Sequence, residues 1–335
     1  MKVLIATGIY PPQIGGPAKY AGNLAREFGA MGHRVSVSAY GPVERALPFG
    51  LRHAFYFLRL LPRFFGADAV LALDTVSVGL PAVLGARLFG KRIVVRPGGD
   101  FLWESYVERT GNLVPLPLFY TKAKTLSVKE QLLFRVQRFV LRHASVVAFN
   151  TPWLRDIWRH IYELDISKTC IIQNYCVKEA ASAPTPVKKV FLASGRALKL
   201  KNTSGLREAF ALVRERQEDI SLDDMPSSPD EFLKRLRECY AVVVASISEV
   251  SPNVIFEAVS LGKPFIVTEH SGLPKDLKRA GIEIDPLNIE SMSTALLFLS
   301  DDAEYAKRKA LVSALSCNHG WQEIAKEFIR LFETK

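Results

Sequence analysis

Cysteine is scarce in this chain of 335 residues, and several patterns on which common site types depend are missing. The four cysteines form no Cys-x-x-Cys pair and have no histidine set nearby, which argues against a zinc site or a disulfide framework and favours reduced thiols. No run of 18 apolar residues occurs, so no membrane-spanning segment is expected. The opening Met1–Gly8 is too short for a signal peptide and indicates a first strand.

Two further missing motifs bear on the chemistry. Asp-x-Asp does not occur and the six histidines are scattered, so we expect no dedicated metal site and no cofactor. Gly-x-Gly-x-x-Gly is missing after the first strand, which removes the main support for a dinucleotide-dependent dehydrogenase.

Charge is unbalanced: 44 lysines and arginines against 34 acidic residues give a net charge of +10. This excess favours anionic partners, which are nucleic acid, an anionic membrane face or phosphorylated substrates. No nucleic-acid recognition motif is present. The proportions of apolar and charged residues, 48% and 23%, are ordinary for a globular protein, and the length suggests two domains.

Short apolar runs alternate with segments of helical period through both halves of the chain, which predicts two doubly wound parallel-sheet α/β domains. The predicted strands are Lys2–Thr7, Arg34–Ala39, Ala69–Leu73, Arg92–Val95 and Ser145–Phe149, then Lys168–Gln173, Lys189–Ala193, Ala241–Ser246, Pro264–Thr268 and Gly281–Ile284. We expect the break between the domains near Asn174–Pro186, where Ala, Ser, Thr and Pro cluster at 180–186. We expect a first domain over 1–175, a second over 176–318 and a terminal helical segment over 319–335.

The most informative stretch follows the predicted strand Ala241–Ser246. Ser251 suits a helix N-cap, Pro252 the first helical position and Gly262 the position after the helix ends. Between them only Asn253, Glu257 and Ser260 are polar, which predicts a buried helix and a partner for Glu257. The N-terminus of such a helix attracts anions, and Glu257 lies roughly 7–8 Å along its axis from Pro252, about a ribose away from a phosphate held there.

Three other constellations follow predicted strands. Gly15 and Gly16 precede a helix and would let the backbone approach a ligand, although a flexible turn is the alternative. Arg196 and Lys201 could fork around a diphosphate, or form a solvated basic loop. Asp100 follows a strand of the first domain, and could contact an acceptor hydroxyl or the donor sugar, or cap a helix.

The Glu249-x7-Glu257 pattern followed by Ala-Val-Ser-Leu-Gly-Lys-Pro resembles the signature of the retaining glycosyltransferases of family 4, the group 1 glycosyltransferases. Tyr-Pro-Pro before Gly-Gly and the Gly-Arg…Lys-Asn segment add to the resemblance. It implies the GT-B fold, in which two Rossmann-like domains face a cleft, and a terminal helix that crosses back onto the first domain.

The resemblance also implies roles for residues. Glu249 would meet the donor sugar and Glu257 the ribose, while Gly15 and Gly16 contact the donor phosphates. Arg196 and Lys201 would neutralise the leaving nucleoside diphosphate, and the first turn of the helix, with Ser251, Asn253 and Val254, would hold the donor. The expected catalytic residues are therefore Glu249, Asp100, Arg196 and Lys201.

This chain departs from the family in two places. Asp100 stands where many members carry a histidine. Only one helix, Pro229–Glu238, fits between the short strand at Ile220–Leu222 and the strand at Ala241, so the second domain is trimmed and base specificity is not implied.

The resemblance predicts metal-independent hexosyl transfer with retention, from a nucleotide sugar to a glycan, lipid-linked or small-molecule acceptor, as in polysaccharide biosynthesis. We expect a cytoplasmic protein that could contact the inner membrane face. A nucleotide-sugar epimerase of the same fold and a non-catalytic nucleotide-sugar-binding subunit are the alternatives. Residues 51–65 interleave arginines with aromatics and could lie on an anionic bilayer. The alternative is a helix packed on the sheet with its arginines outward.

Overall fold

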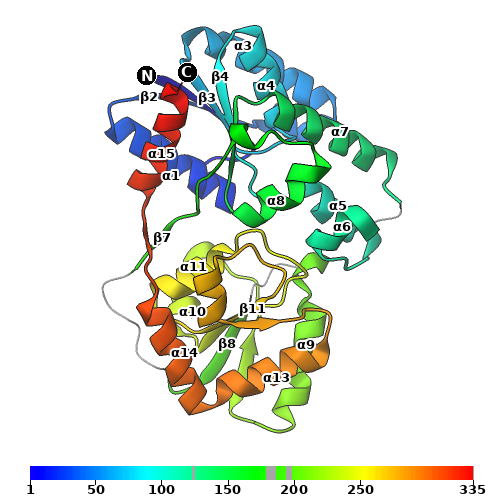
Figure 1. Ribbon diagram of the computed structural model, residues 1–335, viewed down its shortest axis with the longest axis vertical. Helices are drawn as coiled ribbons and strands as arrows, with labels where there is room; N and C mark the ends of the chain where they lie inside the picture. Colours follow the sequence, from blue (N-terminus) through cyan, green and yellow to red (C-terminus); the bar gives the residue numbers. More distant parts are fainter. Residues whose placement is uncertain (123–124, 179–185, 194–197, 335) are drawn as a thin grey trace. The chain divides into compact units, whose positions relative to one another are not determined.

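The structure is a computed structural model that describes residues 1–122, 125–178, 186–193 and 198–334. The chain divides into two compact units (Figure 1). Unit 1 comprises Met1–Leu102, Leu126–Asn174 and His319–Lys335, and unit 2 comprises Trp103–Thr125 and Tyr175–Asn318. No helix within the described ranges combines the length and the apolar character that a bilayer crossing requires.

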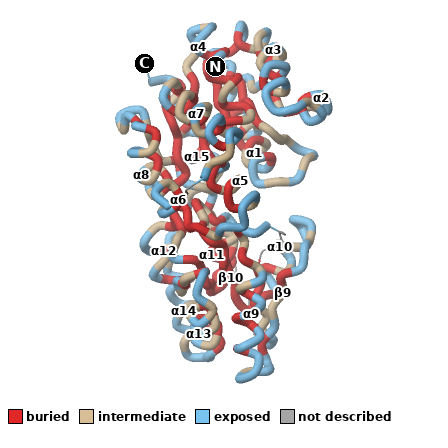
Figure 2. Tube along the Cα trace, turned by 90° about the vertical axis from the view of Figure 1, so that its right-hand side faces the viewer, coloured by how far each residue is buried: buried red, intermediate tan, exposed pale blue. Residues whose placement is uncertain are grey.

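Unit 1 is built on a six-stranded parallel sheet in the order β2-β1-β3-β4-β5-β6. Its strands are β1 (Lys2–Thr7), β2 (Arg34–Ala39), β3 (Ala69–Ala72), β4 (Arg92–Val95), β5 (Val146–Phe149) and β6 (Thr169–Ile171). The central strands are short apolar runs without alternation, as expected for strands covered on both faces, and they are buried (Figure 2).

Helices cover both faces of this sheet. The chain steps from β1 outward to β2 through α1 (Gly16–Ala30) and then back to β3 through α3 (Leu51–Gly66). Because such crossovers are right-handed, the reversal puts α3 on the face opposite α1. With α1 lies α15 (Trp321–Glu333), whose Phe328 and Phe332 join the same core as Leu24 and Phe28. The helix α4 (Gly79–Leu88) packs beside α3, and α7 (Val128–His143) packs beside α4.

Unit 2 is built on a five-stranded parallel sheet in the order β12-β11-β10-β8-β9. Its strands are β8 (Lys189–Ala193), β9 (Ile220–Asp223), β10 (Ala241–Val244), β11 (Phe265–Thr268) and β12 (Ile282–Ile284). Alternate residues of β10 enter different cores: Val242 and Val244 pack into one, Ala241 and Val243 into the other. Every side chain of this strand is therefore buried, which explains its unbroken apolar run.

Each core of unit 2 is closed by its own helices. Those on one face are α9 (Thr203–Arg214) and α13 (Ile289–Ser300), and those on the other are α10 (Pro229–Glu238), α11 (Asn253–Ser260) and α12 (Lys275–Ala280). The helix α14 (Asp302–Ala314) contributes to both cores. The remaining short elements are α2 (Pro42–Ala46), α5 (Phe101–Thr110), α6 (Leu116–Lys122), α8 (Pro152–Ile161), η1 (Ile166–Lys168), β7 (Cys176–Val177), η2 (Lys199–Lys201) and β13 (Asn318–His319).

The predicted fold class, two doubly wound parallel-sheet domains with a trimmed second one, is confirmed. Between β9 and β10 the described chain has one helix, α10, as the sequence predicted. The strand expected near Lys168–Gln173 is β6, and it pairs with β5 at the edge of the first sheet. The terminal helix α15 packs within unit 1.

The expectation of reduced thiols is wrong for two of the four cysteines. Cys176 and Cys317 form a disulfide, with their Cα atoms 5.1 Å apart and a sequence separation of 141. Such a pairing depends on tertiary proximity, which local cysteine spacing does not reveal. Cys170 and Cys239 are free thiols.

The contact between α3 and α4 depends on Gly85. A Cβ placed on Gly85 would overlap the ring of Phe64, which is wholly buried. We predict that Gly85→Ala is destabilising. Overpacking against Phe64 should lower the free energy of unfolding by about 1–3 kcal/mol. This loss is larger than the ~0.5–1 kcal/mol by which alanine stabilises a helix relative to glycine.

Urea unfolding of Gly85→Ala alone and in a Phe64→Leu background tests this cause, because the smaller side chain should reduce the loss. Gly29→Ala is the control, since nothing lies within 4 Å of its Cβ position in α1. An equal loss in both Phe64 backgrounds would contradict the packing explanation.

Candidate functional site

In unit 2, two of the residues predicted to bind a ligand, Lys201 and Glu249, lie on segments that leave the carboxyl edge of the sheet. Lys201 follows β8, and Glu249 follows β10, its neighbour in the sheet. Parallel neighbouring strands end at the same edge, where ligands of open α/β sheets bind.

Lys201 and Glu249 form an ion pair. Lys201 Nζ lies 2.5 Å from Glu249 Oε1, and Ser246 Oγ donates to the same oxygen at 2.7 Å. The side chains are 18% and 16% exposed, respectively, so the pair is partly shielded but open to a ligand. The structure thus brings together two of the predicted catalytic residues.

The backbone of Glu249 is held by the loop after β11. Its N–H donates to the carbonyl oxygen of His270 at 3.0 Å, and its carbonyl oxygen accepts from Gly272 N at 2.9 Å. These bonds resemble one rung of a parallel ladder between Glu249 and Ser271. Glu249 is therefore positioned through its main chain as well as its carboxylate.

The loop of Lys201 has its own anchor in Asn202. Asn202 adopts a left-handed conformation (φ 51°), which asparagine tolerates better than most residues. Its Nδ2 donates to the carbonyl oxygen of Pro286 at 2.6 Å. Arg196, the predicted partner of Lys201 in holding a diphosphate, lies outside the described residues, so its role stays a prediction.

The helix α11 differs in two respects from the sequence prediction. It begins at Asn253 with Pro252 in the N-cap position, one residue later than predicted, and Gly262 follows its end at φ 67° as expected. It is also buried on one side only, because Glu257 is half-buried and shares a face with the exposed Asn253 four residues earlier. The expectation of a helix buried on nearly all sides therefore holds for its apolar residues Ile255, Phe256, Ala258 and Val259, but not for the side with Asn253 and Glu257.

Unit 2 also contains residues that the sequence reasoning missed. The segment Trp103–Thr125, which interrupts unit 1 in sequence, packs here. Glu108 Oε1 accepts from Leu200 N at 3.0 Å, and Leu116 N donates to Ser248 Oγ at 2.9 Å. These two bonds brace the residues directly before Lys201 and Glu249. No local pattern in 103–125 indicates this packing.

The glycine pair of unit 1 is constrained. Gly15 has a φ of 155°, and a Cβ there would come within 2.7 Å of Ile9 Cδ1, so a side chain would be strained and crowded. Gly16 begins α1, and Gly15 is its N-cap residue. The backbone of Gly15 thus favours glycine at this position, and its contact with a phosphate stays a prediction.

Asp100 lies before α5 in unit 1 and is fully buried. Its Oδ2 accepts from Trp158 Nε1 of α8 at 2.7 Å. Trp158 is also fully buried, so this bond ties the loop after β4 to α8. Such an engaged carboxylate suits a positioning role, and its predicted contact with a substrate stays untested.

A second carboxylate of unit 1, Asp74, was not singled out from the sequence. It follows β3, and its Oδ1 accepts from the backbone N–H groups of Val78 and Gly79 at 2.9 and 3.1 Å. Burial raises the pKa of Asp74 above its usual value, although these bonds act in the opposite direction. Asp74 Oδ2 would lie 3.9 Å from a Cβ on Gly8 at the end of β1, so both residues mark the carboxyl edge of this sheet.

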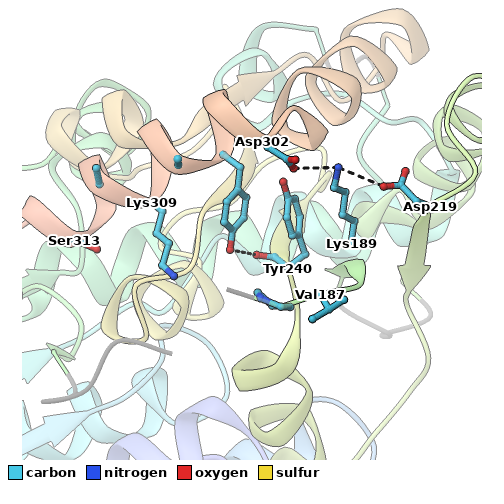
Figure 3. A pocket seen from close by; sticks show the side chains of 11 residues that line it. Val187, Lys189, Asp219, Tyr240, Asp302, Lys309 and Ser313 are labelled. Carbon is cyan, nitrogen blue, oxygen red and sulfur yellow. Dashed lines mark hydrogen bonds and ion pairs between the residues drawn. The ribbon is translucent and has the colours of Figure 1, made fainter. Parts of the chain in front are cut away.

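One hollow of unit 2, about 690 Å³, lies away from these residues (Figure 3). Lys189, which opens β8, and Tyr240, which precedes β10, place it at the amino edge of the sheet. Lys189 Nζ lies 3.3 Å from Asp219 Oδ2 and 3.2 Å from Asp302 Oδ1. None of the predicted site residues that the structure describes lines it.

Comparison with known proteins was made by sequence and by structure. No protein-family model matches the chain, and no curated protein matches it in sequence. Sucrose-phosphate synthase from Thermosynechococcus elongatus matches with a TM-score of 0.72 at 14% identity, over 99% of this chain and 98% of that one. WaaG, a glycosyltransferase involved in lipopolysaccharide biosynthesis, matches with a TM-score of 0.70 at 12% identity, over 99% and 100%. The chain has the GT-B fold.

Other proteins with this architecture carry a different activity in their description. A putative UDP-N-acetylglucosamine 2-epimerase from Listeria monocytogenes matches with a TM-score of 0.60 at 14% identity, over 98% of this chain and 94% of that one. At these identities the likeness shows the fold alone.

The position of Glu257 leads to a test of its role. Because its side chain is half-buried, Glu257→Gln should leave the free energy of unfolding within about 0.5 kcal/mol, the usual range for such positions. Loss of a charge-assisted bond to a ribose should weaken nucleoside diphosphate binding by about tenfold. Thermal unfolding and calorimetric titration measure both, with the exposed Glu215→Gln as control. Collapse of stability with normal affinity would make Glu257 a structural residue.

Proposed function

We propose that this protein transfers a hexosyl group from a nucleotide sugar to an acceptor, with retention of anomeric configuration and without a metal ion. The observation that carries the proposal is the Lys201–Glu249 pair beside the N-terminus of α11. It combines a cation for a leaving diphosphate with a carboxylate that can accept from sugar hydroxyls.

When the nucleoside diphosphate leaves, the site must stabilise the negative charge that develops on it. Negative charge grows on the phosphate oxygens, and preorganised donors aimed there lower the barrier most. Lys201, together with Arg196, would supply cations, and the backbone of Ser251, Asn253 and Val254 at the start of α11 would supply N–H groups. In unit 1, the resemblance assigns Gly15 and Gly16 to donor phosphates.

Lys201 can serve Glu249 and the diphosphate together. An ammonium group has three donors, so it can keep its bond to Glu249 Oε1 and give others to phosphate oxygens. Glu249 would then accept from the donor sugar with its second oxygen. Glu257, further along the accessible face of α11, would accept from the ribose hydroxyls.

The fold supports sugar transfer in general terms. The structural neighbours include a glycosyltransferase, a sucrose-phosphate synthase and a UDP-forming α,α-trehalose-phosphate synthase in complex with glucose-6-phosphate. We extend this to unit 1 as the acceptor-binding domain and unit 2 as the donor-binding domain, with Asp100 positioning the loop near the acceptor. The acceptor would be a glycan, a lipid-linked glycan or a small molecule, as in polysaccharide biosynthesis.

A nucleotide-sugar epimerase is the second candidate, favoured by the Listeria monocytogenes neighbour. Such an enzyme needs acid–base groups around one bound sugar. A non-catalytic nucleotide-sugar-binding subunit is the third candidate, and it would bind the donor through the same residues without turnover.

A panel of nucleotide sugars separates these functions. Release of nucleoside diphosphate that depends on an added acceptor, unaffected by a chelator, supports transfer, and the anomeric proton signal of the product shows retention or inversion. An epimerised nucleotide sugar without dependence on an acceptor supports the epimerase. Tight binding without turnover of any donor supports the binding subunit.

We predict that Lys201 and Arg196 hold the diphosphate. Replacing both with alanine should weaken nucleoside diphosphate binding by roughly 3 kcal/mol or more, since charge-assisted bonds contribute about 1.5–3 kcal/mol each. Calorimetric titration measures the loss of binding free energy. The dependence of the affinity on salt concentration should also be weaker in the double variant. Unchanged affinity in the double variant would refute this assignment.

Loss of Glu249 should impair transfer more than binding. Glu249→Ala should leave nucleoside diphosphate affinity within a few-fold, while kcat falls by a factor on the order of 10² because a contact that strengthens in the transition state is lost. Glu218→Ala, exposed in the turn before β9 at the other edge of the sheet, is the matched control. Equal losses of binding and turnover would mean that Glu249 only shapes its loop.

A further inference from the structure

The outer side of α3 in unit 1 is apolar. Leu51, Phe55, Leu58 and Phe65 are 60%, 38%, 62% and 76% exposed, and their spacing places them along one side of the helix. The opposite side, with His53, Tyr56, Leu60 and Phe64, is buried against the sheet. Exposed turns along α3 are visible in Figure 2. The helix therefore presents apolar side chains in two directions.

The arginines of this helix do not occupy its outer side. Arg52 Nε donates to the carbonyl oxygen of Leu47 at 3.2 Å, and Arg63 Nη1 to that of Arg59 at 3.0 Å. Arg59 Nε lies 2.6 Å from Glu44 Oε1, and its guanidinium lies over the Tyr56 ring. The packing with arginines outward, considered from the sequence, is thus not observed.

The apolar surface continues onto α4. Leu84 and Leu88 are 40% and 68% exposed. The rings of Phe65 and Phe89 meet edge to face at 4.7 Å, which joins the ends of the two helices. We call the residues Leu51, Phe55, Leu58, Phe65, Leu84 and Leu88 the apolar face.

The helices on this side of the sheet carry an excess of positive charge. In α2, α3, α4 and α7, all of whose residues are described, the acidic residues are Glu44 and Glu130, and both are 1% exposed. The same four helices carry nine basic residues: Arg45, Arg52, Arg59, Arg63, Arg87, Lys129, Arg135, Arg138 and Arg142. The basic residues therefore dominate the solvent-facing charge of α2, α3, α4 and α7, which we call the helical layer.

The helix α7 adds a basic hollow to the layer. Arg135, Arg138 and Arg142 line a hollow of about 520 Å³ together with Phe139 and His143. Glu163 offsets part of this charge, because it lies 2.7 Å from Arg138 and 3.3 Å from Arg142. Arg135 is exposed, one turn closer to the start of the helix.

We propose that the helical layer of α2, α3, α4 and α7 docks unit 1 on a bilayer that contains anionic lipids. The apolar face would lie among the acyl chains and the basic residues at the headgroups. A bilayer surface offers both chemistries at the required depths. A second copy of the chain would instead bring one set of cations against another, which opposes association. The proposal rests on this surface alone and does not depend on the proposed sugar transfer.

The test uses the full chain and flotation with vesicles. The protein should float with vesicles of equal parts phosphatidylcholine and phosphatidylglycerol, and about tenfold less with phosphatidylcholine alone, because each basic residue near the surface adds to binding. Added salt should reduce binding to the anionic vesicles. Equal binding to both vesicles, or none to either, would overturn the proposal.

Two sets of variants locate the contact. Leu58→Glu with Phe65→Glu should reduce vesicle binding by about tenfold or more, while Leu212→Glu with Leu311→Glu, at two exposed leucines of unit 2, should not. Arg87→Glu with Arg135→Glu should act like the first pair, and the exposed Arg214→Glu on α9 is its control. Because all these side chains are exposed, Tm and nucleoside diphosphate affinity should hold.

Other outcomes would identify another occupant. If the wild-type protein is a dimer that Leu58→Glu with Phe65→Glu converts to a monomer, and it does not bind vesicles, the apolar face is a self-association surface. If it binds inorganic phosphate through Arg135 but no vesicle, the hollow is a soluble-anion site. Either result overturns the bilayer proposal.

Discussion

Strands whose two faces are both buried place the strongest constraint on this protein. In β10, Val242 and Val244 enter one core while Ala241 and Val243 enter the other, and β3 is buried at all four positions. A parallel sheet of this kind is stable only when helices cover both faces. The crossovers that supply these helices leave the loops at the carboxyl edge as the open part of each sheet. The candidate site of unit 2 lies on those loops.

This arrangement explains why the polar residues of unit 2 converge. Lys201 and Glu249 lie 48 residues apart, yet their strands are neighbours and end at one edge. The loop after β11 holds the backbone of Glu249, and Asn202 holds the loop of Lys201. The segment 103–125 adds Glu108 and Leu116 to the same loops. A partly shielded ion pair is thus fixed from several sides before any ligand is bound.

The helix α3 covers the first sheet with one side and leaves its other side exposed. One side of this helix is required for the core, and Gly85 lets it approach α4 closely at Phe64. Its outer side is free of that requirement, yet Leu51, Leu58 and Phe65 remain apolar and exposed. Exposed apolar side chains grouped on one surface often mark an interaction site. The cations around it favour an anionic partner.

The sequence by itself determined the strand–helix alternation, the strand limits to within a few residues and the likeness of Glu249-x7-Glu257 to a known signature, because these depend on local periodicity and short spacing. The sequence also predicted the helix α10 and the position of Gly262 after the end of α11. Only the tertiary structure decided that Lys201 pairs with Glu249, that Glu257 is half-buried, and that Asp100 accepts from Trp158. The Cys176–Cys317 bond and the packing of 103–125 in unit 2 belong to the same group. The physical reason is that each depends on which distant segments meet and which side of a helix they leave open.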